Sequence, residues 1–158
     1  MSKEQTEIAS KFLSEACVFE GASVPIEYLR AFSNRLIYTP FELPSQLLKL
    51  RVIYIGVELG ELTKGRLKPS HTFFTAAHGF TYRNSIALSE SSRELAAFLR
   101  GETIEAVGNF DLCGEYSRYM PVSVHGCPIG FCKYSDGTLK NHLPKGLLNL
   151  RCGAASDE

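Results

Sequence analysis

Apolar residues near the start of the chain recur at the spacing of an α-helix. Ser2 and Gln5 fit a capping box at the beginning of this helix, and Gly21 is expected to end it. A second, shorter helix is predicted after Pro25. Residues 1–45 are therefore predicted to form a helical preface that packs on the rest of the protein. The side chains expected to point inward are Ile8, Phe12, Leu13 and Cys17 in the first helix and Ile26, Leu29 and Phe32 in the second.

Beyond residue 50, stretches rich in β-branched and aromatic residues alternate with short helical ones. Ser91 and Glu94 fit a capping box for the last of these helices, and Gly101 is expected to end it. Pro69 suits the first position of a shorter helix, which is predicted to start at 69–71. The predicted elements are a strand at 51–57, a polar turn at 64–68, a helix that starts at 69–71, an extended segment at 80–88 and a helix at 89–100.

The last third of the chain has the alternating pattern of β-strands. Apolar and polar residues alternate over 119–126, and Pro121 indicates that this strand lies at a sheet edge. A second strand is predicted at 129–134, and Asp136-Gly137 after it is a strong signal for a hairpin. The basic, proline-broken stretch that follows predicts no regular element.

Short strands around interspersed helices favour an α+β fold, most naturally a small mixed β-barrel with flanking helices. The chain has 158 residues, which is enough for one domain with its own core. We therefore expect the helical preface at 1–45, one domain at 46–152 and a frayed tail at 153–158.

The charges are segregated along the chain. The formal net charge is zero, with 17 basic and 17 acidic residues, which argues against a general binder of polyanions. Residues 49–71 and 133–151 are nevertheless basic, whereas 89–115 between them is acidic. If the two basic segments meet in the folded protein, they form one positive face, as local contact with phosphates requires.

Motifs of enzymes, metal sites and membrane proteins are not evident. The five cysteines lack the spacing of a zinc or redox site, and without an export signal we expect reduced thiols in the cytoplasm. The four histidines lack metal spacing, and no glycine-rich nucleotide loop or nucleophile elbow occurs. No apolar run approaches the length of a membrane helix. The sequence leaves open whether a cysteine and a histidine form a catalytic pair, because such partners meet only in the folded protein. We expect no cofactor and no metal.

Two segments resemble a known family. The first, 51–71, reads RVIYIGVELGELTKGRLKPSH, and the second, 125–148, reads HGCPIGFCKYSDGTLKNHLPKGLL, with a Leu-Arg-Gly-Glu step at 99–102 between them. In this order and spacing they resemble the C-terminal PUA-like region of the RsmF group of Sun-type ribosomal RNA cytosine-5-methyltransferases. The matching residues are Leu59, Gly60, Glu61, Arg66, Pro69, Ser70, His71, Lys133, Gly137, Lys140, Asn141, Pro144, Lys145, Gly146 and Leu147.

The sequence also departs from this family. The catalytic half of the family carries a Pro-Cys motif, whereas Cys127-Pro128 has the reversed order and lies in the predicted hairpin region. Where the family shows an arginine after the final Gly-Leu, this chain has Leu148, and Arg151 follows three residues later. The resemblance therefore implies an RNA-binding module without catalytic residues.

The resemblance implies ribosomal or transfer RNA as the ligand, bound by shape and phosphate contacts. Further expected partners are a methyltransferase or a ribosomal component, and we expect a monomer that does not bind membranes. Tyr116 and Tyr134 are candidates for stacking on bases. The residues expected to contact RNA are Lys64, Arg66, Ser70, His71, Lys133, Lys140, Asn141, Lys145 and Arg151.

Other interpretations of the same residues stay open. Ser70 and His71 also fit a capped helix start with a buried histidine, the stretch 140–145 also fits a solvated loop, and Glu61 could pair with Arg66. A different class of function is a small enzyme or small-molecule binder on a PUA-like barrel. That function requires His71, Lys140 or Cys132 to line a cleft. A third class is a protein that delivers RNA to a separate methyltransferase.

Overall fold

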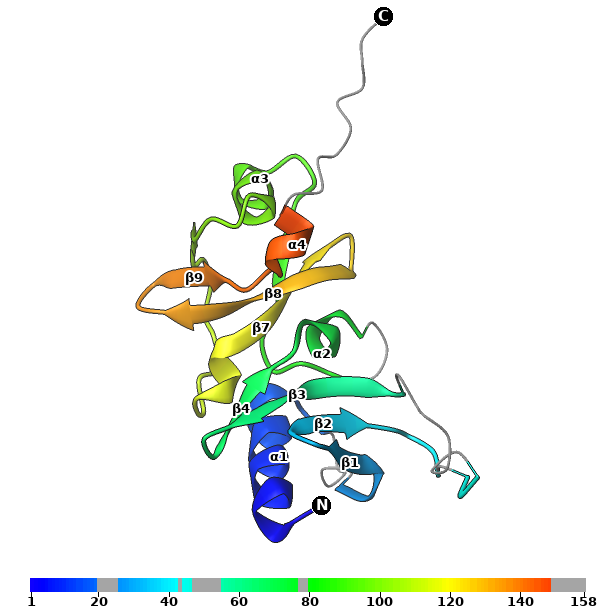
Figure 1. Cartoon of the computed structure of the whole chain (residues 1–158). Helices are drawn as coiled ribbons and strands as arrows, with labels where there is room; N and C mark the ends of the chain where they lie inside the picture. The colour runs from blue at the N-terminus through cyan, green and yellow to red at the C-terminus, as the bar shows by residue number, and fades with distance from the viewer. Residues whose placement is uncertain (20–25, 43, 47–54, 77–79, 149–158) are drawn as a thin grey trace, which may run out of the picture.

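The computed structural model describes residues 1–19, 26–42, 44–46, 55–76 and 80–148, and it has an α+β fold with two β-sheets (Figure 1). The first part contains α1 (Lys3–Ala16), the 3-10 turn η1 (Ile26–Tyr28), β1 (Leu29–Phe32), β2 (Arg35–Tyr38), β3 (Val57–Thr63), β4 (Arg66–Pro69) and α2 (His71–Thr75). The second part contains β5 (Ile86–Leu88), α3 (Arg93–Leu99), β6 (Ile104–Glu105), the 3-10 turn η3 (Tyr116–Arg118), β7 (Tyr119–Val124), β8 (Cys127–Ser135), β9 (Thr138–Asn141) and α4 (Lys145–Leu148).

The first sheet is antiparallel and has the order β1-β2-β3-β4. The helix predicted after Pro25 is wrong, because only a 3-10 turn forms there and Leu29–Phe32 pairs with β2. Leu29 is buried and Phe32 is exposed, so the three-residue spacing that suggested a helix belongs to two faces of a strand. The predicted boundary after residue 45 passes between β2 and β3, which pair with each other. The division into domains stays a prediction.

Strand β3 begins at Val57, the last residue of the strand predicted at 51–57, and positions 51–54 lie outside the described residues. The polar turn predicted at 64–68 is confined to Lys64 and Gly65, since the chain returns as β4 from Arg66. In this strand Leu67 is buried, and its neighbours Arg66 and Lys68 are exposed on the other face.

The second sheet has the order β5-β7-β8-β9-β6, in which β5 runs parallel to β7 and the other pairs are antiparallel. Its two edge strands curl toward each other, because Ile86 of β5 and Ile104 of β6 belong to one buried cluster with Met120, Val122 and Leu139. The curled sheet is a half-barrel, as expected for a PUA-like fold.

Two expectations for this sheet need correction. Strand β7, which contains Pro121, is an interior strand between β5 and β8. The proline is tolerated because β5 pairs with β7 only from Val122 onward. The basic stretch after the hairpin is also more regular than expected. It forms strand β9 and, beyond Pro144, the short helix α4. The hairpin itself is confirmed, with positive φ angles of 50° at Asp136 and 79° at Gly137.

Local signals for the helix ends are largely confirmed. Ser2 and Gln5 form the predicted capping box, although α1 ends at Ala16 and Gly21 lies outside the described residues. The hydroxyl of Ser92, one residue after the predicted Ser91, caps α3 by accepting from the amide of Leu95. Gly101 ends this helix with a φ of 84°, and the side chain of Leu148 packs against it.

One of the two hydrophobic clusters joins the two parts of the chain. Phe12 of α1 and Phe73 and Phe74 of α2 are fully buried in a cluster that also contains Tyr116 and Phe131 of the second part. The rings of Phe74 and Phe131 stack with centroids 4.6 Å apart at 18°. This contact joins α2, which follows the first sheet, to strand β8 in the second sheet.

Arg83 makes a second connection between the two parts. Its guanidinium donates to the carbonyl oxygens of Glu15 at 3.0 Å and Ser14 at 2.8 Å, and it pairs with Asp111 at 2.8 Å. Carbonyl groups in the last turn of a helix lack partners within the helix and carry partial negative charge, so a cation stabilises this end of α1.

Gly60, in the Leu-Gly-Glu motif of β3, has a steric role. A Cβ atom at this position would overlap the carbonyl oxygen of Lys68 on the paired strand β4 and crowd the side chain of Leu67. Because backbone atoms cannot move aside cheaply, the close approach of these two strands requires glycine.

We expect Gly60→Ala to lower the free energy of unfolding by about 2–3 kcal/mol, because it forces β3 away from β4. Gly146→Ala is the matched control, since Gly146 lies in α4 with no atom near its Cβ position, and alanine favours the helix. Urea denaturation followed by circular dichroism measures both variants. Equal stabilities of the two variants would show that the strands do not approach as closely as described.

Burial separates the described cysteines into two groups. Desolvation raises the pKa of the Cys17 and Cys132 thiols to about 12, whereas Cys113 and Cys127 are exposed. Iodoacetamide reacts with the thiolate. At pH 8 we expect it to label Cys113 and Cys127 in the native protein and to label Cys17 and Cys132 only after unfolding. Peptide mass spectrometry measures the labelling at each position, and fast native labelling of Cys132 would contradict its packing in the buried cluster of the second sheet.

Candidate nucleic-acid interface

Two lysines lie directly opposite each other on neighbouring strands of the second sheet. Lys133 of β8 pairs in register with Lys140 of β9, and on its other side Lys133 pairs with Tyr119 of β7. Residues opposite each other in antiparallel strands point to the same face, so the three side chains form one row across the sheet. We call Tyr119, Lys133 and Lys140 the lysine row.

The lysine row carries positive charge without a carboxylate beside it. Within the described chain, ion pairs involve Lys11, Arg35, Arg83, Arg100 and His125, and none of them includes Lys133 or Lys140. The ammonium group of Lys133 lies 4.7 Å from the centre of the Tyr119 ring, a cation–π contact that holds it over the sheet. The opposite face of the same strands carries Met120, Cys132 and Leu139, which are buried.

A stack of rings reaches the surface beside the lysine row. Phe131 stacks on Phe74 inside the core, and His142 stacks on Phe131 with centroids 5.1 Å apart at 27°. The rings of Tyr119 and His142 form an edge-to-face pair with centroids 5.8 Å apart at 71°. Phe74 and Phe131 are buried, whereas His142 is exposed.

The charge around His142 comes from both sheets. Desolvation lowers the pKa of His142 below its usual value, and the positive charges of Lys133 and Lys68 lower it further. The imidazole is therefore neutral at pH 7. Because Lys68 belongs to β4 and Lys133 to β8, cations of the two basic segments approach the same ring.

The β3–β4 hairpin holds the predicted residues Lys64 and Arg66. Lys64 lies in the turn with a φ of 50°, and both side chains are exposed. Arg66 shares its face of β4 with Lys68. Glu61, considered above as a partner for Arg66, lies across from Lys68 and accepts a hydrogen bond from Asn34.

Ser70 and His71 have structural surroundings. The hydroxyl of Ser70 caps α2 by accepting from the amide of Phe73 at 3.1 Å, and it donates to the carbonyl of Glu58. The His71 ring lies 6.5 Å from that of Phe131, and its buried Nε2 atom has no hydrogen-bond partner among the described residues. These contacts match the capped helix start that the sequence left open as an alternative.

Asn141 uses its amide within the protein. Its Nδ2 atom donates to the carbonyl oxygen of Phe98 at 2.7 Å, and its Oδ1 atom accepts from the amide of Leu143 at the same distance. The side chain therefore ties the end of β9 to the end of α3 and shapes the turn that contains His142.

The remaining predicted residues lie toward the end of the chain. Lys145 is exposed at the start of α4, and Arg151 lies outside the described residues. Leu148, found where the family shows an arginine, packs on Gly101 and holds α4 against the end of α3. This apolar contact is the physical reason why leucine fits here.

The two tyrosines considered for stacking on bases both pack within the protein. Tyr116 is buried, and its hydroxyl accepts from the amide of Leu67 at 3.0 Å, while Tyr134 packs on Phe110. The sequence reasoning missed Lys68, Tyr119 and His142 as members of the site. Period-two alternation could have placed Tyr119 on one face of its strand, but its lysine neighbour depends on strand pairing.

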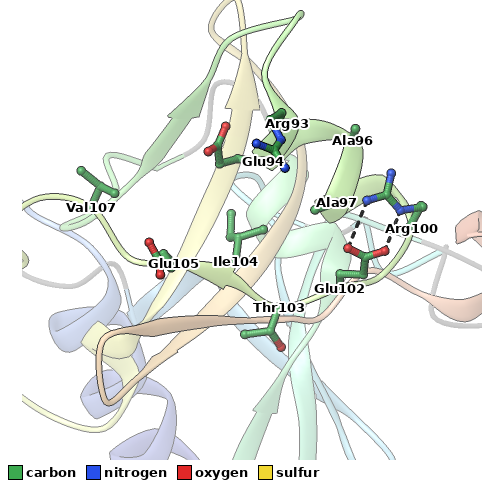
Figure 2. A pocket seen from close by; sticks show the side chains of 10 residues that line it. All are labelled: Arg93, Glu94, Ala96, Ala97, Arg100, Glu102, Thr103, Ile104, Glu105 and Val107. Atoms are coloured by element: carbon green, nitrogen blue, oxygen red, sulfur yellow. Dashed lines mark hydrogen bonds and ion pairs between the residues drawn. The ribbon is translucent and has the colours of Figure 1, made fainter.

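A hollow of 480 Å³ lies elsewhere, between α3 and the segment that follows it (Figure 2). Arg100 and Glu102 pair there through two hydrogen bonds of 2.6 and 3.1 Å. Glu94, Glu105 and Arg93 also line the hollow, so its carboxylates outnumber its guanidinium groups and disfavour phosphate. The enzyme interpretation requires His71, Lys140 or Cys132 to line a cleft, and none of the three lines this hollow.

The described residues contain no cluster of three or more histidine, cysteine or acidic side chains that could hold a metal ion. No helix among them is long and apolar enough to cross a membrane.

Comparisons with known proteins give two family matches. Residues 11–76 match the model described as the RsmF rRNA methyltransferase first C-terminal domain, and residues 83–149 match the methyltransferase RsmF PUA domain. A search of curated proteins gives no match. Both matching models come from one family, and they follow each other along nearly the whole described chain. The chain therefore belongs to the RsmF family, in which it corresponds to the first C-terminal domain and the PUA domain.

Proposed function

We propose that this chain is a non-catalytic RNA-binding module that holds structured ribosomal or transfer RNA through a basic surface. We define the basic surface as Arg66 and Lys68 of β4 with Lys133 of β8 and Lys140 of β9. The observation that carries the proposal is the placement of Lys133 directly opposite Lys140 without a carboxylate partner among the described residues.

Like charges directly opposite each other on paired strands destabilise a sheet, by an amount on the order of 0.2–1 kcal/mol. A phosphate between the two ammonium groups would reverse this repulsion and release the counterions of the nucleic acid. The row thus costs stability in the free protein and favours an anionic ligand.

The zero net charge of the whole chain fits recognition of RNA by one local surface. With 17 basic and 17 acidic residues, the protein has no net charge to attract RNA from a distance. Binding then depends on a local group of cations that matches the spacing of phosphates. Structured RNA offers such spacing through the shape of its backbone.

The two family matches support an RNA-associated role, since both models describe parts of an rRNA methyltransferase outside a catalytic domain. We place the protein in the cytoplasm as a monomer, where it presents RNA to a methyltransferase or to a ribosomal component. Of the residues expected to contact RNA, Lys64 in the β3–β4 turn and Lys145 at the start of α4 are further exposed cations.

If the four cations of the basic surface contact single-stranded phosphates, affinity for transfer RNA or ribosomal RNA fragments should fall with salt at a log–log slope of about −3. Lys133→Ala with Lys140→Ala should reduce the slope to about −1.5, because two contacts are lost. Fluorescence anisotropy over a salt series measures the slopes. Lys3→Ala with Arg93→Ala removes the same charge elsewhere and should leave the slope unchanged. A flat response of the unaltered protein would exclude this function.

Lys140→Glu separates folding from binding. It replaces a like-charge pair by an opposite-charge pair, so we expect it to raise the free energy of unfolding by about 0.5–1 kcal/mol. We expect RNA affinity to fall by roughly tenfold or more, because an attraction becomes a repulsion. Thermal denaturation and anisotropy measure the two effects, and Lys140→Thr should be intermediate in both. Loss of stability, or unchanged affinity, would contradict the role of the lysine row.

A further inference from the structure

We propose that the exposed ring of His142 is a stacking platform for one unpaired base of the bound RNA. The inference rests on the proposed function and adds to it the kind of RNA feature that is recognised.

The ring of His142 continues a stack that begins inside the core. Phe74, Phe131 and His142 follow one another at 4.6 Å and 5.1 Å, with interplanar angles of 18° and 27°. Phe74 and Phe131 are 0% and 4% exposed, whereas His142 belongs to the exposed residues. Phe131 stacks on one face of the His142 ring and Tyr119 packs on the ring at 71°, yet residue 142 as a whole stays exposed, so part of the ring is open to a ligand.

The His142 ring is held in place before any ligand binds. The amide of His142 donates to the carbonyl oxygen of Phe131 at 3.1 Å, which extends the pairing of β8 and β9. The amide of the next residue, Leu143, donates to the side chain of Asn141, which is itself tied to Phe98. A ligand that stacks on a fixed ring loses less binding free energy to ordering of the protein.

The chemistry around the His142 ring also suits a nucleobase and its phosphates. A neutral imidazole offers a flat π-face, and every nucleobase has a matching one, so stacking needs no particular base. Lys68 and Lys133 are near enough to affect the charge of His142, and their ammonium groups can hold the phosphates on either side of the base. A base inside a helix has both faces covered, so only an unpaired base can stack here.

The test uses three RNA hairpins with the same stem. The first carries one bulged 2-aminopurine, whose fluorescence falls when the base stacks, the second an abasic site in the same bulge, and the third no bulge. The first two carry the same phosphates and differ only in the base. We expect the protein to bind the first about tenfold more tightly than the second, with quenching on binding.

His142→Ala and His142→Leu should abolish the preference and the quenching while leaving the salt slope unchanged. His142→Phe should keep both, because it retains a ring on Phe131. His125→Ala is the matched control, since His125 is an exposed histidine that pairs with Glu90 away from the basic surface. Melting temperatures measured for each variant identify any loss of folding.

The outcomes distinguish the two proposals. If the protein binds all three hairpins equally with a steep salt slope, or if His142→Ala keeps the preference, the stacking role is overturned and the RNA-binding function remains. If His142→Phe loses the preference while it stays folded, stacking on an aromatic ring is also overturned. If the unaltered protein binds none of the hairpins and no ribosomal or transfer RNA, both proposals fail.

Discussion

The stacking of Phe74 on Phe131 is the contact on which the rest of the structure depends. It brings α2, at the end of the first sheet, against a central strand of the second sheet in one shared core. Burial of such a ring contributes on the order of 1.5–3 kcal/mol, so the two parts gain much of their stability from each other. The contact also fixes where Lys68 lies relative to Lys133.

Phe131 connects this core to the surface. One neighbour of its ring is the buried Phe74, and another is the exposed His142. The packing that stabilises the fold therefore also orients the ring at the candidate interface. Asn141 and Leu148 also support the candidate interface from inside the protein. Asn141 holds the end of β9 against α3, and Leu148 holds α4 against the end of the same helix.

The net charge of the protein is zero, but acidic and basic side chains lie on different regions of its surface. Carboxylates gather around the hollow beside α3, and Lys133 and Lys140, which form no ion pair with another described residue, lie opposite each other on β8 and β9. A polyanion would be repelled by the first region and attracted by the second. In the proposed function, this difference would orient the RNA on the protein, which a uniformly basic surface would not do.

The sequence by itself determined the features that depend on neighbouring residues. The capping box of Ser2 and Gln5, the stop at Gly101 and the hairpin at Asp136-Gly137 involve groups only a few residues apart. Tertiary structure alone decided that β1 and β2 are strands, because Leu29 gains burial only against distant residues. It likewise decided that Asn141 supports a turn, and that Lys68, Tyr119 and His142 meet beside Lys133. These residues lie far apart along the chain, and only the pairing of strands and the shared aromatic core bring them together.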